Sequence, residues 1–526
     1  MRTIKLIMTG MILLFCSSLH TGEIPTLGAQ IWIEPGQTKE DIDQWFKTLA
    51  DLHMPITRLF IMWDVLEPQP DQWDFTLYDQ AFDAAAKHHV KIVASLAPTH
   101  APVFRGGVPA TQHDEMPETR EMLEQQKIYI SRVVNRYHQH PALYAWMQQN
   151  EPGRPHNTGP LTLQRYREWL RNKYGSIDHL NTVWHHHYPS FQDIGYNPDW
   201  ERYGWMDPDP WYDWREFGQE HLTWYMLWIA DAIRRFDPDT PLHLNPHGLV
   251  GNLIFSNYEL HTWRDMLQSL GASIHVAWHF GLLQRIQYTM GVSYVCDLIR
   301  GAGEPDPFWV TELQGGNNIY SAVRPHCPTP EDVAQWVWTS IGTGADHVIF
   351  WLLNWRAQGN EAGEWSMLDF QGKPTARLTE ASKIARIINE NRIFFQKAEP
   401  LLPHITILYS YRTMMQQART RRDYSGPGRD ANAHIMAVLG MYKALQDIGV
   451  PAQLKAMEDF DWTRRTNHFA IVPHATMLSD HHLKQMQTFV KNGNQLLISG
   501  LSGYYDETET ARPVRDNPFT ALTGAD

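Results

Sequence analysis

Short apolar runs recur along most of the chain, and each is followed by a stretch with helical periodicity. The runs are residues 27–34, 56–63, 91–98, 143–152, 241–248, 272–280, 308–315 and 347–355. They are apolar at nearly every position rather than at alternate ones, which is typical of parallel strands buried on both faces. The pattern therefore predicts eight parallel strands.

Amphipathic segments separate these runs. One helix is expected to begin after Thr38, where Glu40 and Asp41 supply an acidic first turn. The other predicted helices cover residues 76–88, 118–138, 161–174, 213–236, 258–270, 331–343 and 378–395. The alternation predicts a (β/α)8 TIM barrel, with an insertion rich in Trp and His at residues 174–214. A doubly wound open sheet is the alternative, although we find no glycine-rich phosphate loop to support it.

The chain after the barrel repeats the α/β alternation on a smaller scale. Strands are predicted at residues 405–409, 468–472 and 494–498, and helices at 433–448 and 479–492. We therefore expect a barrel domain over residues 23–398 and a smaller, flavodoxin-like α/β domain over residues 399–526. The last ten residues show no clear terminal element. We expect either a truncated or a reduced second domain.

The first residues have the pattern of a secretory signal peptide. Arg2 and Lys5 precede the apolar residues 6–16, and small residues follow. The run is shorter than the roughly 20 apolar residues that a membrane span needs. We expect residues 1–22 to be removed and the protein to be secreted or periplasmic. An uncleaved anchor is the alternative, and a lipoprotein site at Cys16 is disfavoured by the bulky Phe15 before it.

Composition narrows the class of protein. The net charge of −13 and the lack of a polybasic run argue against nucleic-acid binding, and no later segment is apolar enough to span a membrane. The 22 Trp residues suit flat platforms for sugar rings as well as core packing. The three cysteines exclude a disulfide framework. In an exported protein Cys296 and Cys327 could still pair, which the sequence does not decide.

Two of the predicted strands end in a glutamate. The fourth reads WMQQNEP and places Asn150 and Glu151 at the barrel mouth, and the seventh reads WVTELQ and places Glu312 there. In such barrels the catalytic groups lie at the carboxyl ends of the strands. One proton donor and one nucleophile or base are what glycoside hydrolysis needs. The alternative is that both carboxylates are structural and pair with Arg or Lys.

Other polar and aromatic residues at strand ends fit a polar pocket. They are Trp32, Glu34, Trp63, Asp64, Asn245, His247, Trp278, His279, Trp351, Asn354 and Trp355. Trp351 and Trp355 could stack on a sugar ring, with core filling as the alternative for each Trp. His247 and His279 could bind a metal, but no third ligand is spaced clearly on the same face, so hydrogen bonding is the favoured interpretation. Motifs of zinc peptidases, serine esterases and P-loop enzymes are absent from the sequence.

At these residues the sequence resembles glycoside hydrolase family 42, the β-galactosidases. The resemblance rests on RLFIMW at residues 58–63, on Glu67-Pro68, on residues 73–75, on the two glutamate motifs and on residues 350–368. It covers the barrel from about residue 28 to 395, and the segment after Pro400 resembles the family's trimerisation domain. A secreted, retaining, exo-acting β-galactosidase is therefore implied, acting on oligo- or polysaccharides with terminal β-galactose, with a homotrimer as the associated assembly.

The resemblance also implies roles for particular residues. Glu151 would be the acid/base and Glu312 the nucleophile. Asn150 would bind the hydroxyl next to the anomeric carbon, and Glu361 would hold galactose hydroxyls.

Three departures from the family pattern concern the sugar subsite. Gly315 and Gly316 follow Glu-Leu-Gln where the family usually has Pro, Tyr320 stands where a pocket Trp is common, and Glu364 stands where a sugar-binding His is usual. We keep Tyr320 and Glu364 as candidate substrate contacts. The zinc-binding cysteine cluster of some members is absent, so no metal or cofactor is expected. A modified galactan, such as a sulfated algal one, would suit Arg105, Arg154 and Arg356 near the strand ends, with surface solvation as the alternative.

Other functions remain as alternatives. The enzyme could be a different β-glycosidase, such as a galactanase, glucosidase or mannosidase. A non-catalytic carbohydrate-binding barrel is a different class, and the presence of Asn150, Glu151 and Glu312 argues against it. A purely structural surface protein is disfavoured by the aromatic and acidic residues at the predicted mouth.

Overall fold

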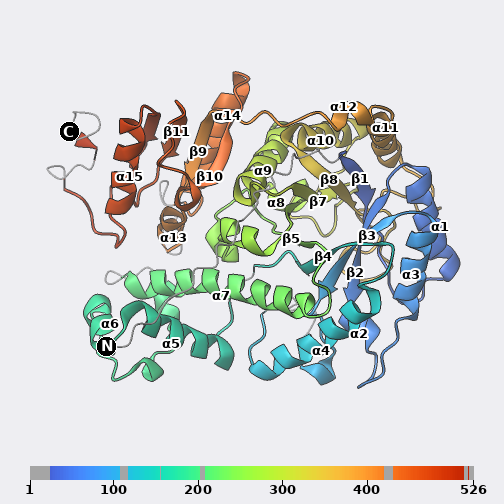
Figure 1. The fold of residues 1–526 in the computed structure, drawn as a ribbon, viewed down its shortest axis with the longest axis horizontal. Helices are drawn as coiled ribbons and strands as arrows, with labels where there is room; N and C mark the ends of the chain where they lie inside the picture. The colour runs from blue at the N-terminus through green and yellow to red at the C-terminus, as the bar shows by residue number, and fades with distance from the viewer. Residues whose placement is uncertain are drawn as a thin grey trace, which may run out of the picture.

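The computed structural model describes residues 24–106, 116–153, 156–201, 208–419, 430–513 and 519–520. Eight parallel strands close into a barrel in chain order, as predicted (Figure 1). The strands are β1 Thr26–Ala29, β2 Ile56–Met62, β3 Lys91–Ala97, β4 Leu143–Asn150, β5 Leu242–Asn245, β6 Ser269–Ile274, β7 Phe308–Gln314 and β8 Ala345–Trp351. The predicted signal peptide, with Cys16, lies outside the described residues.

The strands are buried on both faces, which explains their continuous apolar runs. Every residue of β6 and β7 is buried. Pairing between β2 and β3 is regular over seven residues, whereas the register shifts between Met147 and Asn150 in β4 and between Val310 and Leu313 in β7. Irregular pairing of this kind re-aims side chains beside functional sites. Here it falls around the two glutamates of the barrel mouth.

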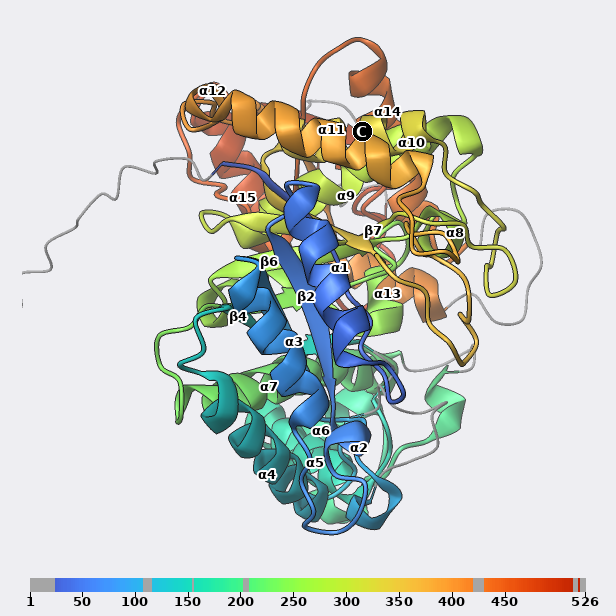
Figure 2. The ribbon, with the colours of Figure 1, turned by 90° about the vertical axis from the view of Figure 1, so that its right-hand side faces the viewer.

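Helices cover the outside of the barrel (Figure 2). Threonine side chains cap several of them, including Thr38 before α1 and Thr329 before α10, each within a capping box. The helices between or after the strands are α1 Lys39–Asp51, α2 Trp63–Leu66, α3 Thr76–Lys87, α4 Arg120–Tyr137, α7 Asp209–Arg234, α8 Val276–His279, α9 Tyr288–Gly303, α10 Pro330–Thr343, α11 Ala376–Glu390 and α12 Arg392–Phe395.

The prediction was wrong around the sixth strand. That strand runs over Ser269–Ile274 rather than 272–280, and the predicted helix at 258–270 is a shorter 3-10 helix, η6 Leu260–Met266. Helix α9 was not predicted. It is buried almost all round because it lies between the barrel and strand β10 Gln453–Ala456, so it lacks the polar stripe that marks a surface helix. A side chain at Gly301 would meet the Leu454 carbonyl oxygen at 1.9 Å, so only glycine allows this approach.

The insertion between β4 and β5 forms its own small core. It contains α5 Pro160–Tyr174, α6 Ile177–Trp184, η3 Phe191–Asp193 and η4 Pro198–Glu201, packed on α7. Trp184 and Trp214 are buried in this core, and the Asp213 carboxylate accepts hydrogen bonds from Lys173, Tyr174 and Trp184. Much of the tryptophan in this segment therefore packs the insertion rather than a sugar-binding surface.

A second parallel sheet lies beside the barrel, as predicted, but it has four strands rather than the three expected (Figure 1). Its order is β10-β9-β11-β12, the 2-1-3-4 order of the flavodoxin-like class. Strand β10 and helix α13 were not predicted from the sequence. Besides β10, the chain after the barrel contains β9 Ile405–Tyr409, α13 Tyr411–Arg419, α14 Ala433–Asp447, η8 Met457–Asp459, β11 Phe469–Pro473, α15 Asp480–Lys491 and β12 Gln495–Ser499. The domain boundary at 398/399 stays a prediction.

Two further points concern the whole chain. Cys296 is buried in α9 and Cys327 is exposed, and both are free thiols, so the disulfide considered above does not form. Among the helices of the described residues, none is both long and apolar enough to cross a bilayer.

Candidate active site

Six side chains from five different strands meet at the carboxyl end of the barrel. They are Arg58, Asn150, Glu151, Asn245, His275 and Glu312. Arg58 lies in β2, Asn150 ends β4, Asn245 ends β5, His275 follows β6 and Glu312 lies in β7. Glu151, directly after β4, has a φ of 41°, a conformation that non-glycine residues rarely adopt. Such strained residues concentrate at functional sites.

Glu312 is buried, and its carboxylate is held by two cationic or hydrogen-bonding neighbours. Arg58 Nη1 donates to Oε1, and His275 Nε2 lies 2.8 Å from Oε2. Burial by itself would raise the pKa of Glu312, but the charge of Arg58 and the hydrogen bonds from His275 and Arg58 outweigh it. The pKa of Glu312 is therefore below its usual value, and the carboxylate is ionised at neutral pH.

Arg58 joins the nucleophile candidate to the fourth strand. Its Nη2 donates to Asn150 Oδ1 at 2.7 Å and to Ser95 at 3.2 Å, and its guanidinium lies 4.3 Å from the centre of the Phe60 ring. The side chain is fully buried. No role was predicted for Arg58 from the sequence, although a single arginine inside the apolar run ITRLFIM could have indicated a functional residue.

Asn245 connects the two glutamates. Its Oδ1 accepts the backbone N–H of Glu151 at 3.1 Å, and its Nδ2 lies 3.2 Å from Asn150 Oδ1 and 3.5 Å from Glu312 Oε1. Ser273 accepts a further hydrogen bond from Nδ2 at 2.9 Å. This network fixes the Glu151 backbone and the Asn150 amide relative to Glu312.

The two glutamates face each other closely. One carboxylate oxygen of Glu151, one of Glu312 and a nitrogen of His275 all lie within 4.8 Å of one another. Retaining glycosidases have carboxyl groups about 5–5.5 Å apart, whereas inverting enzymes need about 6.5–9.5 Å to admit a water. The approach of the two facing oxygens is closer than the separation that an inverting enzyme needs.

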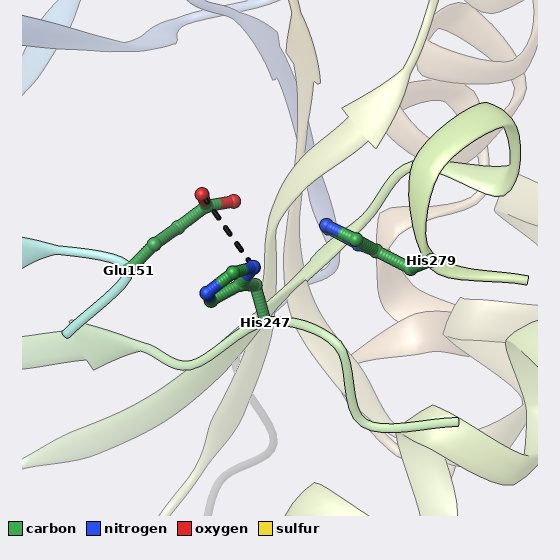
Figure 3. Close-up of side chains that lie close together, drawn as sticks. All are labelled: Glu151, His247 and His279. Atoms are coloured by element: carbon green, nitrogen blue, oxygen red, sulfur yellow. Dashed lines mark ion pairs between the residues drawn. The ribbon is translucent and has the colours of Figure 1, made fainter. Parts of the chain in front are cut away.

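Two histidines stand beside Glu151 (Figure 3). His247 Nδ1 lies 3.8 Å from Glu151 Oε2, and the rings of His247 and His279 are 5.3 Å apart. Burial, together with the nearby His247 and His275, lowers the pKa of His279 well below its usual value, so this imidazole is neutral near pH 7. Glu151, His247 and His279 form one group of side chains that could hold a metal ion, and Glu151, His275 and Glu312 form a second.

An aromatic group lies at the ends of β1, β2 and β8. Trp351 contacts Trp32 and Phe60 edge-on, with ring centres 5.9 and 6.1 Å apart. The Asn354 side chain holds the backbone of Trp32 with two hydrogen bonds of 2.9 Å. Trp351 is only 6% exposed, so most of its ring packs within this aromatic group.

The three acidic or aromatic candidates of the last barrel loops lie in different surroundings. Glu361 is buried and pairs with Arg356 at 3.1 Å, and burial raises the pKa of its carboxyl against the opposing charges of Arg356 and His275. The charge of Glu312 acts on this carboxyl as well and raises its pKa further.

Glu364 is instead saturated by the loop that contains Tyr320. Its carboxylate accepts five hydrogen bonds of 2.6–3.0 Å from Asn318, Ile319, Tyr320 and Ser321. Tyr320 itself is 92% exposed. This geometry gives Glu364 the task of holding the loop, and sugar contacts by either residue stay a prediction.

Several other candidates do not border the mouth as expected. Trp63 is fully buried, stacks on Tyr129 at 5.1 Å and donates to Glu67, so it is a core residue. Arg105 is engaged by Glu67 at 2.5 Å and Asp71 at 2.6 Å, which leaves it poorly placed to bind an anion. Arg154 lies outside the described residues.

The glycine pair after β7 has a steric cause. A side chain at Gly316 would meet the backbone carbonyl carbon and oxygen of Trp365 at 2.0 Å, and one at Gly315 would meet the Met367 side chain at 2.7 Å. The β7 loop therefore packs directly on the backbone of the loop after β8. This close approach explains why glycine stands at these positions.

A parallel eight-stranded barrel with two facing glutamates at its mouth is an arrangement that suits glycoside hydrolysis. A family model described as Beta-galactosidase, glycoside hydrolase family 42, matches residues 34–391. The chain therefore belongs to glycoside hydrolase family 42 and is a glycoside hydrolase.

Similar proteins agree with this assignment. The beta-galactosidase Bga of Halorubrum lacusprofundi is 24% identical over 539 aligned residues, which cover 92% of this chain and 71% of that protein. The crystal structure of a beta-galactosidase from the psychrophilic Marinomonas ef1 has a TM-score of 0.80 at 16% identity, covering 95% of this chain and 79% of its own. An exo-carrageenase of family 42 from Bacteroides ovatus has a TM-score of 0.69 at 14% identity, covering 94% and 67%.

Proposed function

We propose that the protein is a retaining β-galactosidase that releases terminal β-galactose, with Glu312 as nucleophile and Glu151 as acid/base. The observation that carries this proposal is the short separation between the two carboxylates, at most 4.8 Å between facing oxygens. The lowered pKa of Glu312 supports its role, because a nucleophile must be ionised before it attacks.

The reaction follows as a double displacement. Glu312 attacks the anomeric carbon while the glycosidic C–O bond breaks, and Glu151 gives its proton to the departing oxygen. The product is a galactosyl ester on Glu312. Glu151, now a carboxylate, takes a proton from water as that water attacks the anomeric carbon. The ester bond breaks, galactose leaves with retained configuration, and both glutamates return to their starting states.

The surrounding residues position the sugar. Asn150 is oriented by Arg58 and Asn245, so its side-chain amide is poised to contact the hydroxyl next to the anomeric carbon. Glu361 and Trp351 border the mouth and are proposed to hold galactose hydroxyls and the apolar side of the ring. Glu364 and Tyr320 are proposed to act from the loop of residues 318–321, which Glu364 holds in place.

The wider biology rests on the sequence and on the relatives. Residues 1–22 support export, and the resemblance of the second domain to the family's trimerisation domain supports a homotrimer. A different β-glycosidase, such as a galactanase, glucosidase or mannosidase, is the alternative within enzymes, and a non-catalytic carbohydrate-binding barrel is the alternative outside them.

A decorated galactan is a second candidate substrate. Arg356 supports it, because its guanidinium lies 4.2 Å from the centre of the Trp32 ring beside Glu361 and stays partly exposed. Guanidinium groups suit planar oxyanions. The relative from Bacteroides ovatus is titled an exo-carrageenase, which makes such a substrate worth testing. Preference for a sulfated over a plain oligosaccharide, lost in Arg356→Met, would establish it, and equal rates on both would exclude it.

Hydrolysis of a panel of aryl glycosides tests the main proposal. Protein lacking residues 1–22 is compared with Glu312→Gln, and release of aryl alcohol is followed by absorbance. Activity on the β-galactoside alone, lost in the variant, supports the proposal, and NMR of the first-formed sugar must show the β-anomer. Greater activity on a glucoside or mannoside would favour the other glycosidases. Retained activity in a folded Glu312→Gln protein would refute the nucleophile assignment.

A further inference from the structure

The side chains of Glu151, His247 and His279 converge from three different segments of the barrel mouth (Figure 3). Glu151 follows β4, His247 follows β5 and His279 ends α8 after β6. One ligand atom from each lies within 4.8 Å of the other two, and the Glu151–His247 pair is already at 3.8 Å. From the sequence, a metal site at His247 and His279 was disfavoured because no third ligand is spaced clearly on the same face. Glu151, distant in sequence, is that third ligand.

The hydrogen bonding of His279 prepares one nitrogen for a metal. Its Nδ1 lies 3.1 Å from the Ser273 carbonyl oxygen, which only accepts, and a longer contact of 3.4 Å joins it to the His275 N–H. The shorter contact places the proton on Nδ1, so Nε2 carries the free lone pair. Metal-binding histidines almost always donate their second nitrogen to a carbonyl or carboxylate in this way.

We propose that Glu151, His247 and His279 form a binding site for a divalent transition-metal ion such as Zn²⁺. Two imidazoles and one carboxylate are a donor set that zinc accepts, with a further position open to water. Metal–nitrogen bonds of about 2.0–2.1 Å bring ligand atoms to roughly 3.3 Å from one another. The present separations of up to 4.8 Å are longer than this, so ion binding would draw the three side chains together. Glu151 and His247 are both partly exposed, so an ion can reach them.

The second group of candidate ligands is less suitable. Glu312 is paired with Arg58, and His275 Nε2 is directed at the Glu312 carboxylate at 2.8 Å. An ion there would have to displace both contacts and lie beside a buried guanidinium. The site around His247 and His279 requires no such displacement of Glu312.

The effect of the bound metal ion on catalytic activity rests on the proposed function of Glu151. A metal ion on the Glu151 carboxylate takes the lone pair that must carry the catalytic proton. The ion therefore inhibits both proton donation to the leaving group and activation of water. Removal of the ion by a chelator restores the acid/base group, so metal availability controls activity reversibly.

The test measures binding separately from turnover. Protein without residues 1–22 and without an affinity tag is stripped with a chelator and titrated with ZnCl₂ by calorimetry. A parallel titration with CoCl₂ follows the visible absorption of bound Co²⁺. We expect one ion per chain, and we expect His279→Gln and His247→Gln each to weaken binding at least about tenfold. Thermal unfolding in the presence of chelator shows whether each variant is folded. If one variant does not fold, the binding measured for the other variant decides the test.

The run His185, His186 and His187, of which His185 and His187 are exposed and His186 is half-buried, supplies the matched control, because it too could bind a metal. Replacing all three with Gln must leave the stoichiometry and affinity unchanged. Loss of binding in this control, or equal binding by wild type, His247→Gln and His279→Gln, would overturn the proposal. So would failure of wild type to bind a stoichiometric ion.

Measuring how Zn²⁺ inhibits galactoside hydrolysis distinguishes a failure of the metal-site proposal from a failure of the proposed function. If Zn²⁺ binds at the site while galactoside hydrolysis continues at saturation, the metal site stands and Glu151 is not the proton donor. If no galactoside is cleaved at all, the binding titrations still decide the site. If hydrolysis is inhibited at the concentration at which Zn²⁺ binds, and His279→Gln shifts both together, both proposals are supported.

Discussion

Removing Arg58 is expected to damage the site through Glu312. Arg58→Gln takes away the charge that does most to lower the pKa of the Glu312 carboxyl, while the burial that raises it stays. An opposite charge at this range lowers a carboxyl pKa by about 1–3 units. The acidic limb of the kcat/KM profile, which reports ionisation of the nucleophile in the free enzyme, should therefore move to higher pH by about that amount.

Stability should change with a definite dependence on pH. Breaking a buried ion pair by removing one partner costs about 3–5 kcal/mol, because the other charge is left uncompensated. Since the pKa of Glu312 is lowered in the folded state, its stabilising effect is present above the unfolded value of about 4.3 and is lost as pH falls through the folded pKa. The difference between wild type and Arg58→Gln should therefore shrink in acid.

Urea unfolding at pH 7 and at pH 4, with pH–rate profiles, measures both effects. Arg136→Gln is the matched control, because Arg136 pairs with Asp79 at the surface, where an ion pair contributes at most about 1 kcal/mol. In a double-mutant cycle, Arg58→Gln combined with Glu312→Gln should cost less than the sum of the single changes, because no unpaired charge remains. Additive costs together with an unmoved acidic limb would refute the reasoning.

Four other changes give further tests. Glu151→Gln should lower kcat by about 10²–10⁴ for poor leaving groups and much less for dinitrophenyl galactoside, and equal losses on both would contradict its role as acid. Asn245→Ala should lower kcat more than it raises KM, because it releases the Glu151 backbone, and a change in KM alone would count against this. Trp351→Ala should raise KM for galactosides by about 3–10-fold, since an aromatic contact is worth roughly 0.5–1.5 kcal/mol, with Trp338→Ala on the barrel exterior as control. Gly316→Ala should destabilise by about 1–3 kcal/mol in urea unfolding, because its methyl meets the Trp365 backbone, and unchanged stability would show that the two loops can separate.

Most of the barrel could be predicted because its strands are buried on both faces and its surface helices are amphipathic. Helix α9 and strand β10 were not predicted. Helix α9 packs between the barrel and β10, the edge strand of the second sheet, so it lacks the polar stripe of a surface helix, whereas β10 is only four residues long and reads QLKA, which is not a continuous apolar run. The sixth strand was misplaced because residues 269–280, SLGASIHVAWHF, contain only scattered Ser and His residues and no Gly-Pro or charged cluster that would mark where the strand ends.

Sequence reasoning also predicted the two glutamates, since a carboxylate at the end of an apolar strand is costly unless it has a function. It gave no part to Arg58, whose partners come from β3, β4 and β7, and it placed Trp63 in the pocket although that ring packs in the core. A side chain's neighbours across strands follow from register, and register depends on bulges that no local pattern reveals.

The sequence by itself determined the strand and helix alternation, the position of Glu151 and Glu312 at strand ends, and the resemblance to family 42. These follow from periodicity and from short motifs, which are local properties. Only the tertiary structure decided which residues surround the two glutamates. It brought Asn245 between them, directed the Glu364 carboxylate into a loop, and placed Glu151 beside His247 and His279. These contacts depend on closing the barrel, which sets side by side residues that are far apart in the sequence.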